Sequence, residues 1–184
     1  MSVNNPTCPT DCTSFLADVD FDYCNPDVQF GEIDHLYIMS QAGDNLADWT
    51  SLSVWTARMA LLPSSDTNAI VDLSVIGDYP MAETEEITIS LGRKIQTPAT
   101  HTINFEIDDV SDDNYELMRW LECNFLIKFW FAANEVLFGG HTGIEATLKA
   151  KYQIERGQKS LQKIVGVVSW ESKFSPERTT NPMA

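Results

Sequence analysis

Basic side chains are scarce in this chain of 184 residues, which has 12 Lys and Arg against 27 Asp and Glu and a net charge of −15. Residues 1–113 carry a net charge of −17, and residues 114–184 carry +2. Proteins that bind nucleic acid gain much of their affinity by neutralising phosphates, so this composition argues against that class. It argues equally against attraction to an anionic membrane surface.

Long apolar runs are also absent, since no stretch approaches the roughly 20 residues of a membrane-spanning helix. The first residues, MSVNNPTCPTDCTSF, lack the basic start and apolar centre of a secretory signal. We therefore expect a protein that is made in the cytoplasm and does not bind membranes. The length is sufficient for the core of one domain and short for two.

Cysteine is rare, and three of the four cysteines, Cys8, Cys12 and Cys24, lie near the N-terminus. A zinc site built on them would need a fourth ligand from Cys123 or His35, and the resulting spacing is not that of a known zinc motif. We expect reduced thiols, with zinc or a disulfide as the alternative. No cofactor is expected.

No arrangement typical of an enzyme is visible. The chain has three histidines, His35, His101 and His141, and none has a Cys or Ser partner at a spacing with mechanistic meaning. The stretch DVDFD begins like a calcium loop at Asp18, but its sixth and twelfth positions hold Tyr23 and Gln29 instead of Gly and Glu. The sequence therefore predicts a protein that is not an enzyme and has no metal or catalytic residues.

The stretch FGGHTGIEA, residues 138–146, contains three of the nine glycines. A phosphate-binding loop would need a helix after the glycines, so that free amides point at the anion. The segment that follows alternates apolar and polar residues and indicates a strand instead. We interpret the glycines as turn residues with His141 at the tip, and a binding loop is the alternative.

Alternating apolar residues predict strands through most of the chain. The clearest is GIEATLKAKYQIERG, and a last strand over 162–174 is expected to twist or bulge near Gly166. Residues 85–97 and 100–109 should pair as a hairpin through the turn QTPA. The remaining predicted strands cover residues 31–41, 69–76 and 125–138, the last with a tight turn at Asn134 and Glu135.

Two helices are predicted, over residues 48–61 and 111–124, and the second is flanked by residues able to cap it. The fold class is therefore mainly β, an antiparallel β-sandwich or barrel with one firmly predicted flanking α-helix. Residues 1–30 read as an irregular N-terminal arm, 31–175 as the β-domain, and 176–184 as a polar C-terminal tail.

Two groups of residues are candidates for a subunit interface. The aromatic stretch FLIKFWF includes Phe129, Trp130 and Phe131. Aromatic residues are enriched in interfaces, although packing in the core is the alternative. The second group consists of basic residues in the C-terminal part that can meet acidic patches on neighbouring subunits: Lys149, Lys151, Lys159 and Lys163.

The layout resembles that of the tail tube proteins of bacteriophages and the related tube proteins of type VI secretion. The residues that carry the resemblance are the segment EITISLGRKIQTPATHTINFEI, the helix SDDNYELMRWLECN and the strands GIEATLKAKYQIERG and LQKIVGVVSWESKF. The resemblance spans about residues 30–175 and includes no short diagnostic motif.

The resemblance implies a virion protein of the tail whose copies form rings, typically hexameric, that stack into a tube. Other tail proteins would be further partners. An acidic lumen would let DNA pass without binding to the wall. Two alternatives remain: another virion component, such as a tail terminator, connector or capsid-decorating protein, or a small β-domain that binds a metal or ligand through Cys8, Cys12 and Cys24.

Overall fold

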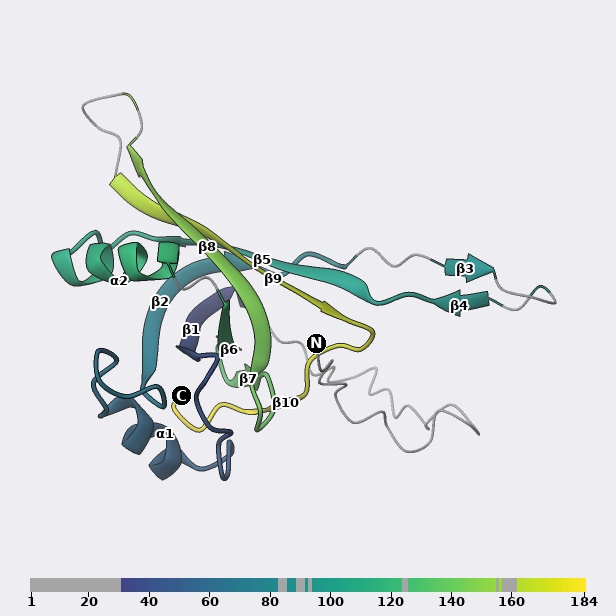
Figure 1. Ribbon diagram of the computed structural model, residues 1–184, viewed down its shortest axis with the longest axis horizontal. Helices are drawn as coiled ribbons and strands as arrows, with labels where there is room; N and C mark the ends of the chain where they lie inside the picture. Colours follow the sequence, from purple (N-terminus) through teal and green to yellow (C-terminus); the bar gives the residue numbers. More distant parts are fainter. Residues whose placement is uncertain are drawn as a thin grey trace, which may run out of the picture.

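The computed structural model describes residues 31–82, 86–88, 92, 94–123, 126–154, 156 and 162–184. Six antiparallel strands form a closed barrel (Figure 1), because β1 pairs with β2 on one side and with β6 on the other. In spatial order the barrel strands are β1 (Ile33–Ser40), β2 (Ile70–Asp78), β5 (Ala99–Ile107), β9 (Gln162–Ser172), β8 (Ile144–Ile154) and β6 (Leu126–Ala133). The predicted arm, residues 1–30, lies outside the described residues.

The expectation of a mainly β, antiparallel fold is confirmed, and the observed architecture is the barrel. Its interior is filled by side chains that alternate along each strand, as the sequence pattern predicts. On β5 the buried residues are Ile103, Phe105 and Ile107, and on β8 they are Ala146, Leu148 and Ala150. Burial of these apolar side chains stabilises the barrel by about 25 cal/mol for each Å² removed from water.

A second core lies outside the barrel, beneath the helix α1 (Leu52–Met59). The outward residues of β1 and β6 pack there, including Tyr37 and Trp130, against Trp55 of the helix. Strand β6 is therefore buried on both faces, which explains its nearly continuous apolar sequence. The helix predicted over residues 48–61 exists, but it begins at Leu52, and Asp48 instead accepts hydrogen bonds from Thr50.

The second predicted helix is confirmed as α2 (Asp112–Cys123). Asp109 organises its start by accepting hydrogen bonds from the backbone amide and hydroxyl of Ser111 and from the Asn114 amide. Met118 and Leu121 of α2 join the core of the barrel, and Tyr115 makes an edge contact with Tyr152 of β8. The fold thus has two helices in its described part, where the sequence firmly predicts one.

The hairpin predicted between residues 85–97 and 100–109 is wrong. The first segment folds on itself as β3 (Glu86–Thr88) and β4 (Lys94–Gln96), which pair with each other. The turn between them contains Gly92, whose φ of 71° suits glycine. Strand β5 instead pairs with β2 and β9, so the β3–β4 hairpin projects from the barrel, as Figure 1 shows.

The bulge predicted near Gly166 is also not observed, because β9 keeps a regular register with both β5 and β8 through this residue. Position 166 has no room for a side chain because of close packing and not because of a bulge. The ring of Phe105, directly across the strand pair, occupies the position that a Cβ atom at Gly166 would take. Gly166 therefore makes room for a core aromatic.

The stretch FGGHTGIEA is a turn between β7 (Val136–Phe138) and β8, as predicted, and not the start of a helix. Gly139, Gly140 and Gly143 all have positive φ. The turn encloses the indole of Trp130, which donates a hydrogen bond of 2.6 Å to the Gly140 carbonyl. A Cβ atom at Gly139 or Gly143 would come within 2.5 and 2.7 Å of that indole, so these glycines also permit close packing.

The chain end predicted as a polar tail is ordered against the β-domain. Strand β10 (Arg178–Thr180) pairs with β7, and β7 in turn forms a hairpin with β6 through the predicted turn at Asn134 and Glu135. The amide of Asn181 donates to the Glu135 carbonyl at 2.6 Å, and Met183 packs against the second core.

Candidate assembly surface

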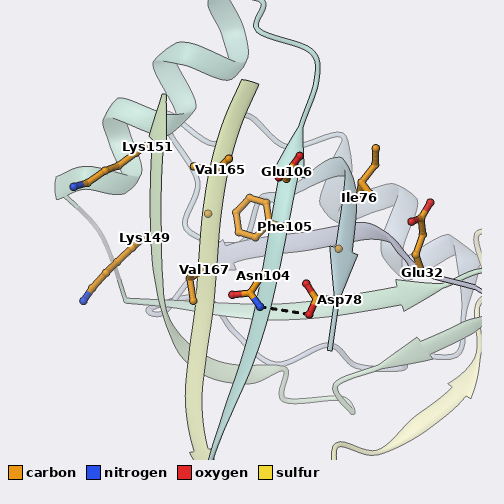
Figure 2. Close-up of a pocket in the computed structure, with 12 residues that line it drawn as sticks. Glu32, Ile76, Asp78, Asn104, Phe105, Glu106, Lys149, Lys151, Val165 and Val167 are labelled. Atoms are coloured by element: carbon orange, nitrogen blue, oxygen red, sulfur yellow. Dashed lines mark hydrogen bonds between the residues drawn. The ribbon is translucent and has the colours of Figure 1, made fainter. Parts of the chain in front are cut away.

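The barrel strands β2, β5, β9 and β8 are neighbours, and we call their outward face the four-strand wall. A hollow of about 600 Å³ lies over this wall, and Figure 2 shows the side chains around it. Its apolar lining includes Val165 and Val167 of β9 and, across β5, Ile76 of β2. Ile76 is 49% exposed and Val167 40% exposed, so both are available for contact with another molecule.

Charge is divided across this wall. Lys149 and Lys151 stand on β8 at one side, whereas Asp78 of β2 and Glu32 lie at the other (Figure 2). Between them, Lys163 donates to both carboxylate oxygens of Glu106 at 2.9 Å. That central pair is neutralised within the chain, so the unlike charges remain at the two sides.

The structure thus brings together three of the four lysines predicted for an interface. Lys149 and Lys151 lie on the four-strand wall (Figure 2), and Lys163 lies there too, bound to Glu106. Lys159 falls outside the described residues. The sequence pattern did not single out Asp78 or Glu32, because an acidic residue in so acidic a chain carries no individual signal. Their significance depends on the strand order, which places β2 and β8 at opposite sides of the wall.

The three aromatic residues predicted for an interface are in the interior of the protomer. Phe129 and Trp130 are 0% exposed, and Phe131 is 1% exposed. Phe129 and Phe131 point into the barrel, whereas Trp130 lies under α1. Their burial supports the alternative of core packing, since none of them is on the surface of a single chain.

The histidines do not form a shared site. His35 lies 2.8 Å from an Asp72 carboxylate oxygen, and His101 is buried between the ring of Trp170 and the hydroxyl of Tyr79, 2.6 Å from its Nδ1. His141 is exposed at the turn before β8. Within the described ranges, no group of three His, Cys, Asp or Glu side chains is arranged to hold a metal ion.

Of the four cysteines, Cys123 is a free, exposed thiol at the end of α2. The candidate zinc ligands Cys8, Cys12 and Cys24 lie outside the described residues. No helix in the described part of the chain is long and apolar enough to span a membrane.

Two tyrosines, the buried Tyr37 and the partly buried Tyr79, have shifted ionisation. Burial raises the pKa of Tyr79 above its ordinary value. Burial also raises the pKa of Tyr37, and the nearby carboxylates of Asp72 and Asp34 raise it further. Both hydroxyls are therefore neutral at physiological pH.

No protein-family model, curated protein or solved structure matches the chain. The function must therefore be argued from the surface itself.

Proposed function

We propose that this protein is a structural subunit that polymerises with copies of itself into rings and tubes, as the resemblance to bacteriophage tail tube proteins implies. The observation that carries the proposal is the four-strand wall, which exposes apolar side chains and carries unlike charges at its two sides. Apolar surface of this kind is typical of an interface. The unlike charges favour contacts between different sides of two copies.

The strand directions are compatible with such an arrangement. Neighbouring strands in the wall alternate in direction, so β8 at one side runs opposite to β2 at the other. When copies are related by rotation about an axis along the strands, β8 of one copy lies antiparallel to β2 of the next. The alternation of strand directions then continues from copy to copy.

Strand β8 is also incompletely paired with other strands, although α2 packs against it. It pairs with β6 only from Ile144 to Thr147, and beyond that point its one strand partner among the described residues is β9. An edge without a partner can accept a strand from another chain. The β8 edge is therefore a reasonable place for a neighbouring copy to join.

Charge selects the orientation of the contact. A symmetric contact through β8 of both copies would place Lys149 and Lys151 beside the same lysines, which is unfavourable. A head-to-tail contact places these lysines near Asp78 and Glu32 of the neighbour. Head-to-tail contacts close into rings or continue as filaments. Such pairing leaves the net charge of −15 unchanged, so DNA passing through a ring would be repelled from the protein.

The proposal is tested by electron microscopy and light scattering of the purified protein over a range of concentrations. We expect rings and tubes, and a protein that stays monomeric at the highest concentration would refute the proposal. A single ring that never stacks would favour a terminator or connector. Binding to capsids without polymerisation would favour a decorating protein, and a stoichiometric metal would favour the metal-binding β-domain.

Charge exchange tests the wall directly. The double variant Lys149→Glu/Lys151→Glu should lose rings, because like charges would then face each other between copies. Adding Glu32→Lys and Asp78→Lys should restore them. The matched control, Arg119→Glu/Lys173→Glu, makes the same change in charge away from the wall and should assemble like the unaltered protein.

A further inference from the structure

Strand β8 extends beyond the strand that pairs with its first part. β6 pairs with β8 from Ile144 to Thr147, whereas residues 148–154 have β9 as their one strand partner in the described part of the chain. If the pairing continued, the residues before β6 would lie beside this second part of β8. The chain before β6 instead forms α2, which packs against β8 (Figure 1). A helix therefore lies against the part of β8 that lacks a second strand.

Side chains, and not backbone groups, hold α2 on β8. The ring of Tyr115 meets that of Tyr152 edge-on, with the ring centroids 5.8 Å apart. Met118 and Leu121 of α2 are buried in the same core as Leu148 of β8. No backbone hydrogen bond joins the two elements within the described ranges. The backbone N–H and C=O groups of residues 148–154 that point away from β9 are therefore not bonded by the helix.

The covered part of β8 is also the part proposed to meet a neighbouring copy. It carries Lys149 and Lys151, the lysines of the four-strand wall. Backbone groups without a strand partner form an edge on which another strand can pair, and a helix packed against such an edge is one way to prevent pairing. In the single subunit, α2 therefore obstructs the contact on which assembly depends.

Few side chains anchor α2 in the core. Two of its 12 residues, Met118 and Leu121, are buried, whereas six of the eight residues of β6 are buried. Tyr115 is 43% exposed and Trp120 41% exposed. Elements with few buried contacts are those that open locally while the rest of a protein stays folded. The barrel closes through strand pairs that do not include α2, so displacement of the helix leaves those pairs intact.

We propose that α2 is an autoinhibitory helix. In the free subunit it packs on β8 and prevents strand pairing there, and it leaves β8 when a strand of a neighbouring copy pairs with residues 148–154. Opening of α2 then limits the rate at which copies join. This inference rests on the proposed function, in which copies join at β8, and it assigns the control of that step to a helix outside the four-strand wall.

Hydrogen exchange followed by mass spectrometry tests the movement of α2 by comparing the free subunit with rings collected by centrifugation. In rings, we expect the amides of residues 148–154 to exchange about tenfold or more slowly, because they gain a strand partner, and those of α2 to exchange about tenfold or more quickly. Strand β1 is paired on both sides within the subunit and is the internal reference. An α2 that is equally or better protected in rings would overturn the proposal.

A single substitution tests whether α2 controls the rate. Tyr115→Ala removes the ring contact with Tyr152 and should shorten the delay before rings form by about two- to tenfold, the factor that one aromatic pair contributes to an equilibrium. Tyr115→Phe keeps the ring and is the matched control, with an unchanged delay expected. Light scattering at equal protein concentration measures the delay. An equal or longer delay for Tyr115→Ala would contradict the proposal, and the exchange measurement on the unaltered protein decides if this variant folds poorly.

The outcomes separate this inference from the proposed function. Rings in which α2 stays protected on β8 would overturn the autoinhibitory role and leave the proposed function intact. Linear chains of copies without rings, with the expected opposite changes in exchange at α2 and β8, would support the role of α2 and overturn the proposed ring. A protein that shows no self-association, with or without the change at Tyr115, would overturn both.

Discussion

At the scale of single residues, close packing explains a glycine for which the sequence pattern predicted a bulge in the strand. Gly166 interrupts a run of β-branched residues, which led to the prediction of a bulge. The structure shows instead a regular strand in which this glycine makes space for the Phe105 ring. A glycine in a strand has two explanations, a bend or a close approach, and only the partner across the strand decides between them.

We predict that Gly166→Ala lowers the free energy of unfolding by about 1–3 kcal/mol, because the added methyl group overpacks a buried site. Urea denaturation measures the change. In a Phe105→Leu background the same substitution should cost less, since the smaller side chain leaves room. Equal costs in the two backgrounds would show that the ring is not the cause.

Tyr37 and Tyr79 predict how stability responds to alkali. Burial raises the pKa of Tyr37 and of Tyr79 in the folded state, whereas both ionise near pH 10 in the unfolded chain. The unfolded state therefore loses these protons first, and stability that is fully present below about pH 10 is lost as the pH rises above that value. Urea denaturation between about pH 8 and 11 should show this decline, and Tyr37→Phe should reduce it. If the free energy of unfolding of that variant falls with pH as steeply as before, the assignment to Tyr37 is wrong.

At the scale of elements, the local sequence pattern was sufficient to predict a helix or strand whose formation depends on its own residues. The helix α2 has acidic residues in its first turn, and β8 alternates almost without exception, so both were predicted nearly to their ends. The pairing of β5 was mispredicted because the same alternation of apolar residues is compatible with two hairpins. One is the predicted hairpin between residues 85–97 and 100–109, and the other is the observed hairpin of β3 and β4. The pattern of residues 85–97 does not reveal that Gly92 turns the chain in the middle of the segment.

The start of α2 supplies a prediction at this scale. Asp109→Ala removes the acceptor for the Ser111 amide and hydroxyl in the turn that leads into α2 and should destabilise the protein by about 1 kcal/mol. Asp108→Ala is the matched control, because it removes an adjacent exposed carboxylate and should have little effect. Thermal or urea denaturation compares the two, and equal effects would mean that charge rather than capping is responsible.

At the scale of the whole molecule, the candidate assembly surface could be predicted only in part. The basic residues of the C-terminal part stand out in an acidic chain, which is why Lys149, Lys151 and Lys163 were found. The acidic side of the wall and the burial of Phe129, Trp130 and Phe131 both depend on barrel closure. That closure brings together residues far apart in the sequence, and no local pattern encodes it.

The hairpin formed by β3 and β4 gives a prediction for the whole molecule. It pairs with no other described strand, and an isolated two-stranded hairpin has little stability in water. Under conditions where the protein is monomeric, we expect its amides to exchange hydrogen orders of magnitude faster than those of β5, β8 and β9. Hydrogen exchange followed by mass spectrometry resolves these segments, and similar protection in hairpin and barrel would contradict the prediction.

The closing pair of the barrel also constrains how the polypeptide acquires its structure during synthesis. Strand β1 emerges early from the ribosome, yet one of its two partners is β6, where Met39 meets Lys128 and His35 meets Ala132. Until that later part has been translated, one side of β1 lacks its native neighbour. Pairing across such a long loop is slow and leaves apolar strands open to aggregation meanwhile. Nascent chains halted before β6 should therefore depend on chaperones more strongly than chains halted after it.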